Sequence, residues 1–302
     1  MLYKFFDDAG GHLAALIAYY GFVSLFPLLL LASTVLGLVL SGDPHAQATV
    51  LRSALHQFPV IGEQLQQPAR LGGGTVGLLI GGLGALYGGL GVAVAVQSAM
   101  NTMWAVPRNE RPNPLKARGR GLLLLATAGL ALLGTTLLSA VWNNGGVGTG
   151  LRWVTLIASV LVNGGAFVVG FRLATARPLS VRDVLPGALA AAVVWQLLQG
   201  FGTTYVKHVV RGASATNSVF AVVLGLLAFL YLAAVALVLC VEANVVRVER
   251  LYPRALLTPL TDDVDLTEGD ERAYTDQAKA QRTKGFERIE VDFDGDRTQG
   301  PG

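Results

Sequence analysis

The sequence has little charge and almost no cysteine. Of its 302 residues only 14% are charged, against about 25% in soluble proteins, and 52% are hydrophobic. Cys240 is the single cysteine, which excludes an intrachain disulfide and a cysteine-rich metal site. The four histidines are scattered, and no phosphate-binding glycine loop occurs. The composition indicates a membrane protein and predicts neither an enzyme nor a bound cofactor or metal.

Long charge-free gaps support this interpretation, because a membrane-spanning helix needs about 20 apolar residues. Six gaps reach or approach that length. They lie between Asp8 and Asp43, Arg70 and Arg108, Arg120 and Arg152, Arg152 and Arg172, Asp183 and Lys207, and Arg211 and Glu242. We read the first gap as a retained helix rather than a cleaved signal peptide. The sequence therefore predicts an all-α integral membrane protein with a bundle of six transmembrane helices.

Basic residues in short loops mark the cytoplasmic side of a membrane protein. The strongest cluster is "VPRNERPNPLKARGR", and further arginines occur in "RLATARPLSVRD" and after residue 246, whereas "NNGGVGTG" is uncharged. The alternation of these loops predicts that both termini are cytoplasmic. The positive charge is not concentrated on one folded surface, so we expect no nucleic-acid partner.

Residues 1–257 are predicted to form the transmembrane domain and residues 258–302 a cytoplasmic tail. The tail is acidic overall and has low hydrophobicity, so we expect it to be disordered. On the outer side, residues 43–74 contain apolar residues at helical spacing and predict a short amphipathic segment. That segment either packs on the bundle or gates a substrate.

Glycines recur at intervals of three and four in the second span. Small residues let helix backbones approach closely where lipid supplies no hydrophobic driving force. The predicted helix-packing glycines are Gly77, Gly81, Gly84, Gly88 and Gly91. Alternatively, these glycines allow the helix to slide or bend during transport.

Several polar or helix-breaking residues interrupt the spans. Pro27 frees the carbonyl of Val23, and a broken helix is one way in which transporters expose backbone to a solute. Glu242 is the only acid within a span; it is either ion-paired at the boundary, with Arg247 one to two turns on, or a proton or cation relay. The candidate cavity or translocation residues are Tyr20, Ser24, Pro27, Gln196, Asn217 and Glu242.

Four sequence blocks resemble the YihY/BrkB family of inner-membrane proteins, formerly labelled ribonuclease BN. They are "AYYGFVSLFPLLLL", "QSAMNTMWAVPR", "VRDVLPGALAAAVVWQLLQGFGTTYV" and "LLAFLYLAAVALVLCVEANVV", within a resemblance covering about residues 5 to 250. The resemblance implies a six-helix protein of the bacterial cytoplasmic membrane with both termini inside. It places Asn101 and Trp104 at the cytoplasmic boundary and is associated with a transport role. Ribonuclease activity would need clustered metal ligands, which the sequence lacks.

Two functional hypotheses follow. The first is a transporter or translocase of a small solute or lipid, in which the candidate residues surround a water-accessible cavity. The second is a non-transporting envelope assembly or scaffold protein, in which the polar residues only join helices. The lipid bilayer is the expected partner in both cases. A second copy of the chain, or another envelope protein, stays open as a protein partner.

Overall fold

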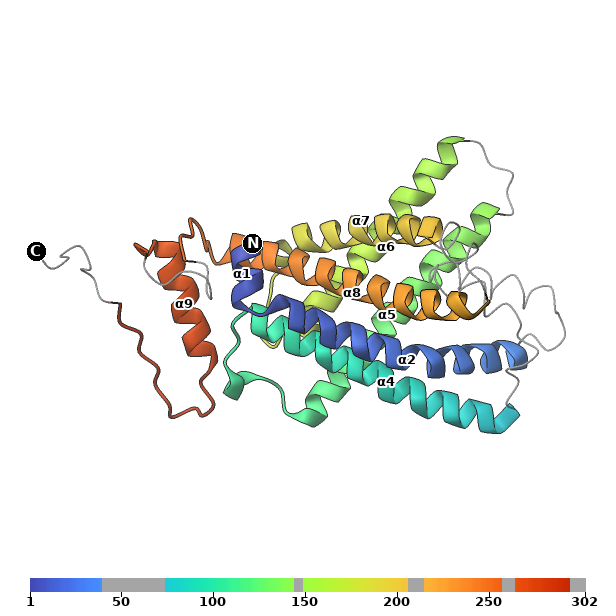
Figure 1. The fold of residues 1–302 in the computed structure, drawn as a ribbon, viewed down its shortest axis with the longest axis horizontal. Helices are drawn as coiled ribbons and strands as arrows, with labels where there is room; N and C mark the ends of the chain where they lie inside the picture. The colour runs from blue at the N-terminus through green and yellow to red at the C-terminus, as the bar shows by residue number, and fades with distance from the viewer. Residues whose placement is uncertain (40–73, 144–148, 206–214, 257–263, 294–302) are drawn as a thin grey trace, which may run out of the picture.

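The computed structural model describes residues 1–39, 74–143, 149–205, 215–256 and 264–293 (Figure 1). Six long helices dominate this part of the chain: α2 (Gly10–Val39), α4 (Gly74–Met103), α5 (Pro114–Asn143), α6 (Thr149–Ala174), α7 (Val181–Tyr205) and α8 (Ala215–Val248). Three shorter elements accompany them: α1 (Leu2–Asp7), the 3-10 helix η2 (Arg108–Glu110) and α9 (Glu268–Ala280). The predicted outer segment, residues 43–74, falls almost wholly outside the described residues.

The long helices are apolar enough to cross a membrane. Five of them, α4 to α8, contain spans of 19 to 26 residues, and α2 contains a shorter apolar segment, Gly10–Leu25, among its described side chains. Many large hydrophobic side chains on these helices are exposed, as expected for surfaces that face lipid rather than water. The prediction of an all-helical membrane bundle is therefore confirmed.

The helices pack in a consistent arrangement. α2 makes its most extensive contact with α4 and also packs on α8, while α5, α6 and α7 follow one another and α7 returns to α8. Figure 1 shows α2, α4 and α8 running side by side. The largest buried core cluster lies toward the end of the bundle where the chain begins, around Met100, Met103, Phe171, Val184 and Val238.

Pro186 interrupts the hydrogen bonding of α7, and side chains of α8 repair it. Proline has no N–H, so the carbonyl of Arg182, four residues earlier, lacks its helical donor. Arg247 Nη2 donates to that carbonyl at 2.8 Å. Asn244 accepts from the N–H of Gly187 at 2.9 Å, and a Cβ on Gly187 would collide with Asn244. These bonds hold α7 and α8 together within the membrane domain.

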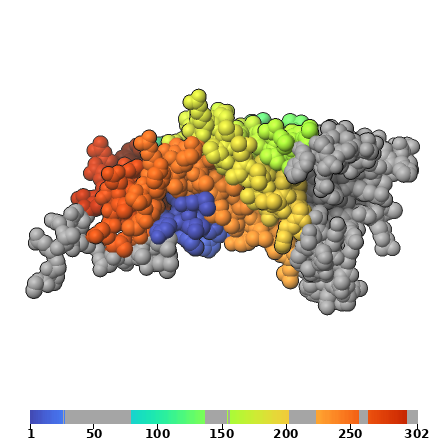
Figure 2. Space-filling model, turned by 90° about the horizontal axis from the view of Figure 1, so that it is seen from above, coloured from blue at the N-terminus to red at the C-terminus, as the bar shows by residue number. Residues whose placement is uncertain are grey.

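The loops predicted to be cytoplasmic meet at one end of the bundle. Asn101 at the end of α4 accepts from the backbone of Ala176 at 2.8 Å, and Arg177 forms an ion pair with Glu249 at 2.7 Å. The N-terminal segment lies against α8 at the same end (Figure 2). All three basic loops thus share one side of the bundle, as the alternation of loops requires.

The tail differs from its sequence prediction. Disorder was expected from residue 258, but residues 268–280 form helix α9. Thr267 caps this helix: its side chain accepts from the N–H of Asp270, and the Asp270 carboxylate accepts from the N–H of Thr267. The low hydrophobicity of the tail was misleading because α9 is held by ionic and polar contacts to the rest of the chain rather than by a large apolar face.

Candidate functional site

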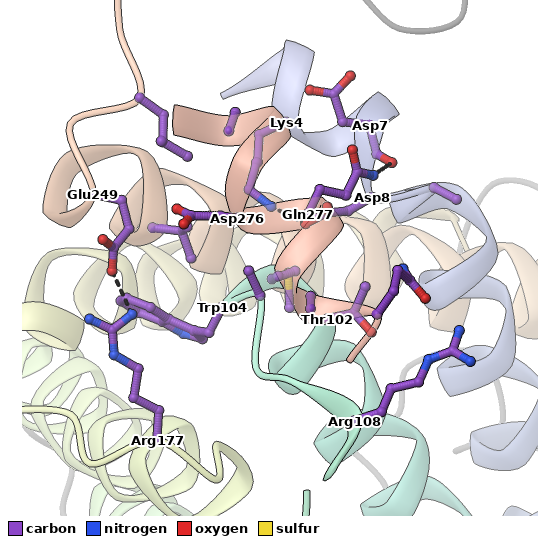
Figure 3. A pocket seen from close by; sticks show the side chains of 18 of the residues that line it. Lys4, Asp7, Asp8, Thr102, Trp104, Arg108, Arg177, Glu249, Asp276 and Gln277 are labelled. Atoms are coloured by element: carbon purple, nitrogen blue, oxygen red, sulfur yellow. Dashed lines mark hydrogen bonds and ion pairs between the residues drawn. The ribbon is translucent and has the colours of Figure 1, made fainter. Parts of the chain in front are cut away.

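A cavity of about 340 Å³ opens at the end of the bundle where the chain begins (Figure 3). Its walls come from α1, the segment that follows α4, the last turn of α8, and α9. Eight charged side chains line it, four of each sign: Lys4, Arg108, Arg111, Arg177, Asp7, Asp8, Glu249 and Asp276. Such a mixed, polar lining suits a charged or zwitterionic ligand better than an apolar one.

One wall of the cavity is built around Trp104. Its indole is 3% exposed, and the guanidinium carbon of Arg177 lies 5.8 Å from the ring centroid, within the range of a cation–π contact. Arg177 also pairs with Glu249 (Figure 3). Burial, and then the nearby charge of Glu249, raise the pKa of Asp276 on the facing helix. The wall therefore combines the Arg177 cation, stacked on Trp104, with one acid, Asp276, whose pKa is raised.

The inner wall carries a buried ion pair at the C-terminal end of α1. Lys4 donates to Asp8, one helical turn later, and both residues are 7% exposed. Ala9, with φ of 51°, turns the chain sharply between α1 and α2. Burial alone would lower the pKa of Lys4, but the charges of Glu242 and Asp8 outweigh it and the pKa is raised. Lys4 therefore stays a cation at neutral pH.

Glu242 lies directly behind this pair. Its side chain is fully buried on α8, and neither carboxylate oxygen receives a hydrogen bond from the described residues. The charged groups that act on it are Lys4, Asp8 and the N-terminal amine. The expected pairing with Arg247 is not observed, because Arg247 donates to backbone carbonyls of α7 instead.

Helix α9 forms the outer wall and is held by a second ionic cluster. Arg254 is 9% exposed at its side chain and bridges two acids, Asp7 at 2.8 Å and Asp270 at 2.6 Å. Gln277 donates to the backbone carbonyl of Asp7 at 2.9 Å. Burial alone would raise the pKa of Asp270, but hydrogen bonds from Ala255, Thr267 and Arg254 outweigh it and lower the pKa to about 2. Asp270 is therefore ionised at any physiological pH.

Three of the predicted cavity residues lie elsewhere, in the contact between α2 and α4. A Cβ on Gly84 would lie 2.7 Å from Pro27 Cβ, one on Gly88 would lie 2.5 Å from Ser24 Cβ, and one on Gly91 would collide with the Tyr20 ring. The three larger residues of α2 thus occupy the spaces that the three glycines leave on α4. Ser24 Oγ donates to the carbonyl of Gly21 at 2.9 Å rather than to that of Val23.

The structure describes less of the remaining predicted residues. Gln196 is half-buried on α7, and Gly81 is buried on α4. Asn217 lies in α8 and Gly77 in α4, but the surroundings of both residues are outside the described part of the structure. None of the six candidate cavity residues lines the cavity of about 340 Å³. Of these six, Glu242 is the one that interacts with cavity-lining residues, namely Lys4 and Asp8.

Sequence reasoning missed Lys4, Asp8 and α9. The spacing of Lys4 and Asp8 is a helical ion-pair spacing, and Thr267 followed three residues later by Asp270 is a capping pattern. Both signals are short and common. Their meaning depends on Glu242 and Arg254, which are distant in the sequence.

Comparison with known proteins gives a family. A model of the family described as Virulence factor BrkB matches residues 1–263, which include every described element except α9. No curated protein and no solved structure matches the chain. The match spans most of the sequence and includes the four blocks quoted above. The chain belongs to the Virulence factor BrkB family.

Proposed function

We propose that this protein is a transporter or translocase of a small solute or lipid, rather than an enzyme. The observation that carries this proposal is Glu242, a fully buried carboxylate in a membrane-spanning helix that receives no hydrogen bond from the described residues. Leaving a carboxylate in this state costs several kcal/mol. Acids inside membrane spans are functional candidates for that reason.

The cavity supports the same proposal. It lies next to Glu242 and offers charges of both signs to a ligand that enters from the adjacent aqueous phase. The convergence of the basic loops supports a cytoplasmic position for this end of the bundle, in a bacterial inner membrane. A ligand would then reach the cavity from the cytoplasm or from the inner leaflet.

One observation favours the alternative, a non-transporting scaffold protein of the envelope. Tyr20, Ser24 and Pro27 fill spaces beside glycines of α4, which is what polar and kinking residues do when they only join helices. A scaffold, however, gives no reason for an unpaired buried acid. The two proposals therefore differ in their predictions for Glu242.

The test is reconstitution of the full chain in liposomes. One assay follows dithionite bleaching of fluorescent phosphatidylglycerol and phosphatidylethanolamine, and a second follows release of a mixture of anionic, cationic and zwitterionic solutes. We expect the wild type to accelerate one of these processes over protein-free liposomes and Glu242→Gln to abolish the acceleration.

The matched control is Glu268→Gln, the same substitution on helix α9 at a residue that does not line the cavity. Glu268 forms an exposed ion pair with Arg272, and such pairs contribute at most about 1 kcal/mol. We expect this variant to keep most of the activity. Wild-type protein that is folded but accelerates no process would refute transport and leave the scaffold.

A further inference from the structure

The cluster of Lys4, Asp8 and Glu242 contains two acids and one base in a space that water barely enters. All three residues are 7% exposed or less. Lys4 is hydrogen-bonded to Asp8, so Glu242 has no cation of its own. With all three groups ionised, the cluster would hold one uncompensated negative charge. Binding one proton makes it neutral, which a low-dielectric environment strongly favours.

Asp8, at the end of α1, and Glu242, on α8, belong to segments that pack against one another. Each acts on the other, and the approach is close enough for a protonated carboxyl to donate to its partner. Two carboxyl groups in this relation titrate as a pair, because the proton on one stabilises the charge on the other. The absence of a donor to Glu242 is then explained, because a protonated Glu242 is itself the donor and the Asp8 carboxylate accepts.

The cavity gives this pair an aqueous entrance. Lys4 and Asp8 line it, whereas Glu242 does not. Glu242 is 0% exposed, and Val238 and Val241, its neighbours on α8, are 1% exposed or less. Asp8 therefore lies between the water of the cavity and Glu242, and is the only one of the two acids that exchanges protons with water directly.

We propose that Asp8 and Glu242, with Lys4, form a proton-binding site that is filled through the cavity, and that the proton held there is the ion coupled to transport. The proton passes from hydronium in the cavity to a carboxylate oxygen of Asp8 and then to an oxygen of Glu242, and Asp8 returns to its carboxylate. This inference rests on the proposed transport function for its role, although the site can be tested without transport.

The other charged groups near the cluster are already engaged. Asp7 pairs with Arg254, and Arg254 also pairs with Asp270 of α9. Asp276 of α9 interacts with Lys4, Glu249 and Arg177, and the N-terminal amine interacts with Glu242 from a more exposed position. A metal ion is a poorer occupant than a proton, because the Lys4 ammonium takes the place a cation would occupy. Among the described residues there is no group of three or more metal-binding side chains.

The experiment is infrared spectroscopy of the full chain in nanodiscs, following the C=O stretching band of protonated carboxyl groups as a function of pH. At neutral pH we expect a protonated carboxyl in the wild type. We expect the band to be lost in Glu242→Gln and equally in Asp8→Asn, because one acid beside Lys4 needs no proton. Lys4→Met leaves two acids without a cation and should keep or strengthen the band.

Glu268→Gln, at an exposed glutamate that does not line the cavity, is the matched control and should leave the band unchanged. A wild-type spectrum without the band, or a band that survives in both acid variants, would overturn the proposal without relying on any variant that fails to fold. In D₂O the band should shift rapidly if the cavity admits water, and a band that resists exchange would refute the entrance. If the protein transports a solute or lipid but shows no protonated-carboxyl band, proton coupling is rejected and the transport function stands. If it shows the band but transports nothing, the proposed function is rejected and the proton-binding site stands.

Discussion

Replacing Asp270 should release helix α9 from the end of the bundle. The Asp270 carboxylate is fully buried and accepts hydrogen bonds from Arg254 Nε at 2.6 Å, Ala255 N at 2.9 Å, Leu256 N at 3.1 Å and Thr267 N at 3.0 Å. In Asp270→Asn only one of the two oxygens remains. The new amide group, which is a donor, must then face N–H groups that are donors themselves.

The size of the effect follows from the pKa of Asp270. A fall from the ordinary 3.8 to about 2 means that the docked state favours the ionised carboxyl by about 2 kcal/mol. Because the pKa is lowered on docking, this stabilisation is fully present above about pH 4 and is lost as the pH falls through about 2. The Asn variant lacks it at every pH. It should therefore open α9 about 30-fold more often, since about 1.4 kcal/mol corresponds to a factor of ten.

Hydrogen–deuterium exchange with mass spectrometry measures this opening directly. We expect faster exchange in residues 268–280 of Asp270→Asn, and a smaller increase in residues 1–9, because Arg254 joins Asp270 to Asp7. Glu268→Gln is the control: Glu268 lies on the same helix, but its ion pair with Arg272 is exposed. If Asp270→Asn exchanges no faster than this control, the ionic cluster does not hold α9.

Two further predictions concern packing between the long helices and are measured by thermal unfolding in detergent. Gly88→Ala should cost about 1–3 kcal/mol, because its Cβ would lie 2.5 Å from Ser24 Cβ, whereas Gly129→Ala meets no atom within 4 Å and should be neutral or slightly stabilising. Equal effects of the two would contradict close packing at Gly88. Asn244→Leu should cost about 1–3 kcal/mol by removing the partner of the Gly187 N–H, and an unchanged midpoint would show that this bond contributes nothing.

The architecture was predictable from the sequence because it depends on local composition. A charge-free gap of about 20 residues indicates a spanning helix, whatever the neighbouring segments are. The position of the basic loops likewise required only their order along the chain. The structure brings these loops to one end of the bundle through contacts such as Arg177 with Glu249 and Asn101 with Ala176.

The candidate site was less predictable because it depends on contacts between distant segments. Glu242 stood out in the sequence as a lone acid, but its partners Lys4 and Asp8 are more than 230 residues away. Arg247 was the nearer cation in the sequence, but its guanidinium donates to the carbonyl of Arg182 on α7. That carbonyl lacks its helical donor because Pro186 has no N–H. The sequence singled out Tyr20, Ser24 and Pro27 for their chemistry. In the structure they fill the spaces that the glycines of α4 leave.

The tail failed as a prediction for the same reason. Its composition predicts that it has too little apolar surface to fold alone. That rule does not apply when a neighbouring segment supplies the missing contacts. Arg254 offers a buried cation, and the backbone that follows it offers two N–H groups to Asp270.

The two ionic clusters differ in how well their acids are satisfied. Asp270 accepts several hydrogen bonds besides its ion pair and is fixed in one protonation state. Glu242 accepts none from the described residues, and in the site that we propose it donates to Asp8 once the pair takes up a proton. The clusters meet in α1, where Asp7 belongs to one and Asp8 to the other. The ion pairs of Arg254 with Asp7 and Asp270 therefore hold the end of α1 in place, next to the cluster of Lys4, Asp8 and Glu242. Helix α9 lies beyond the family match, and the adjacent residues Asp7 and Asp8 connect it to Glu242.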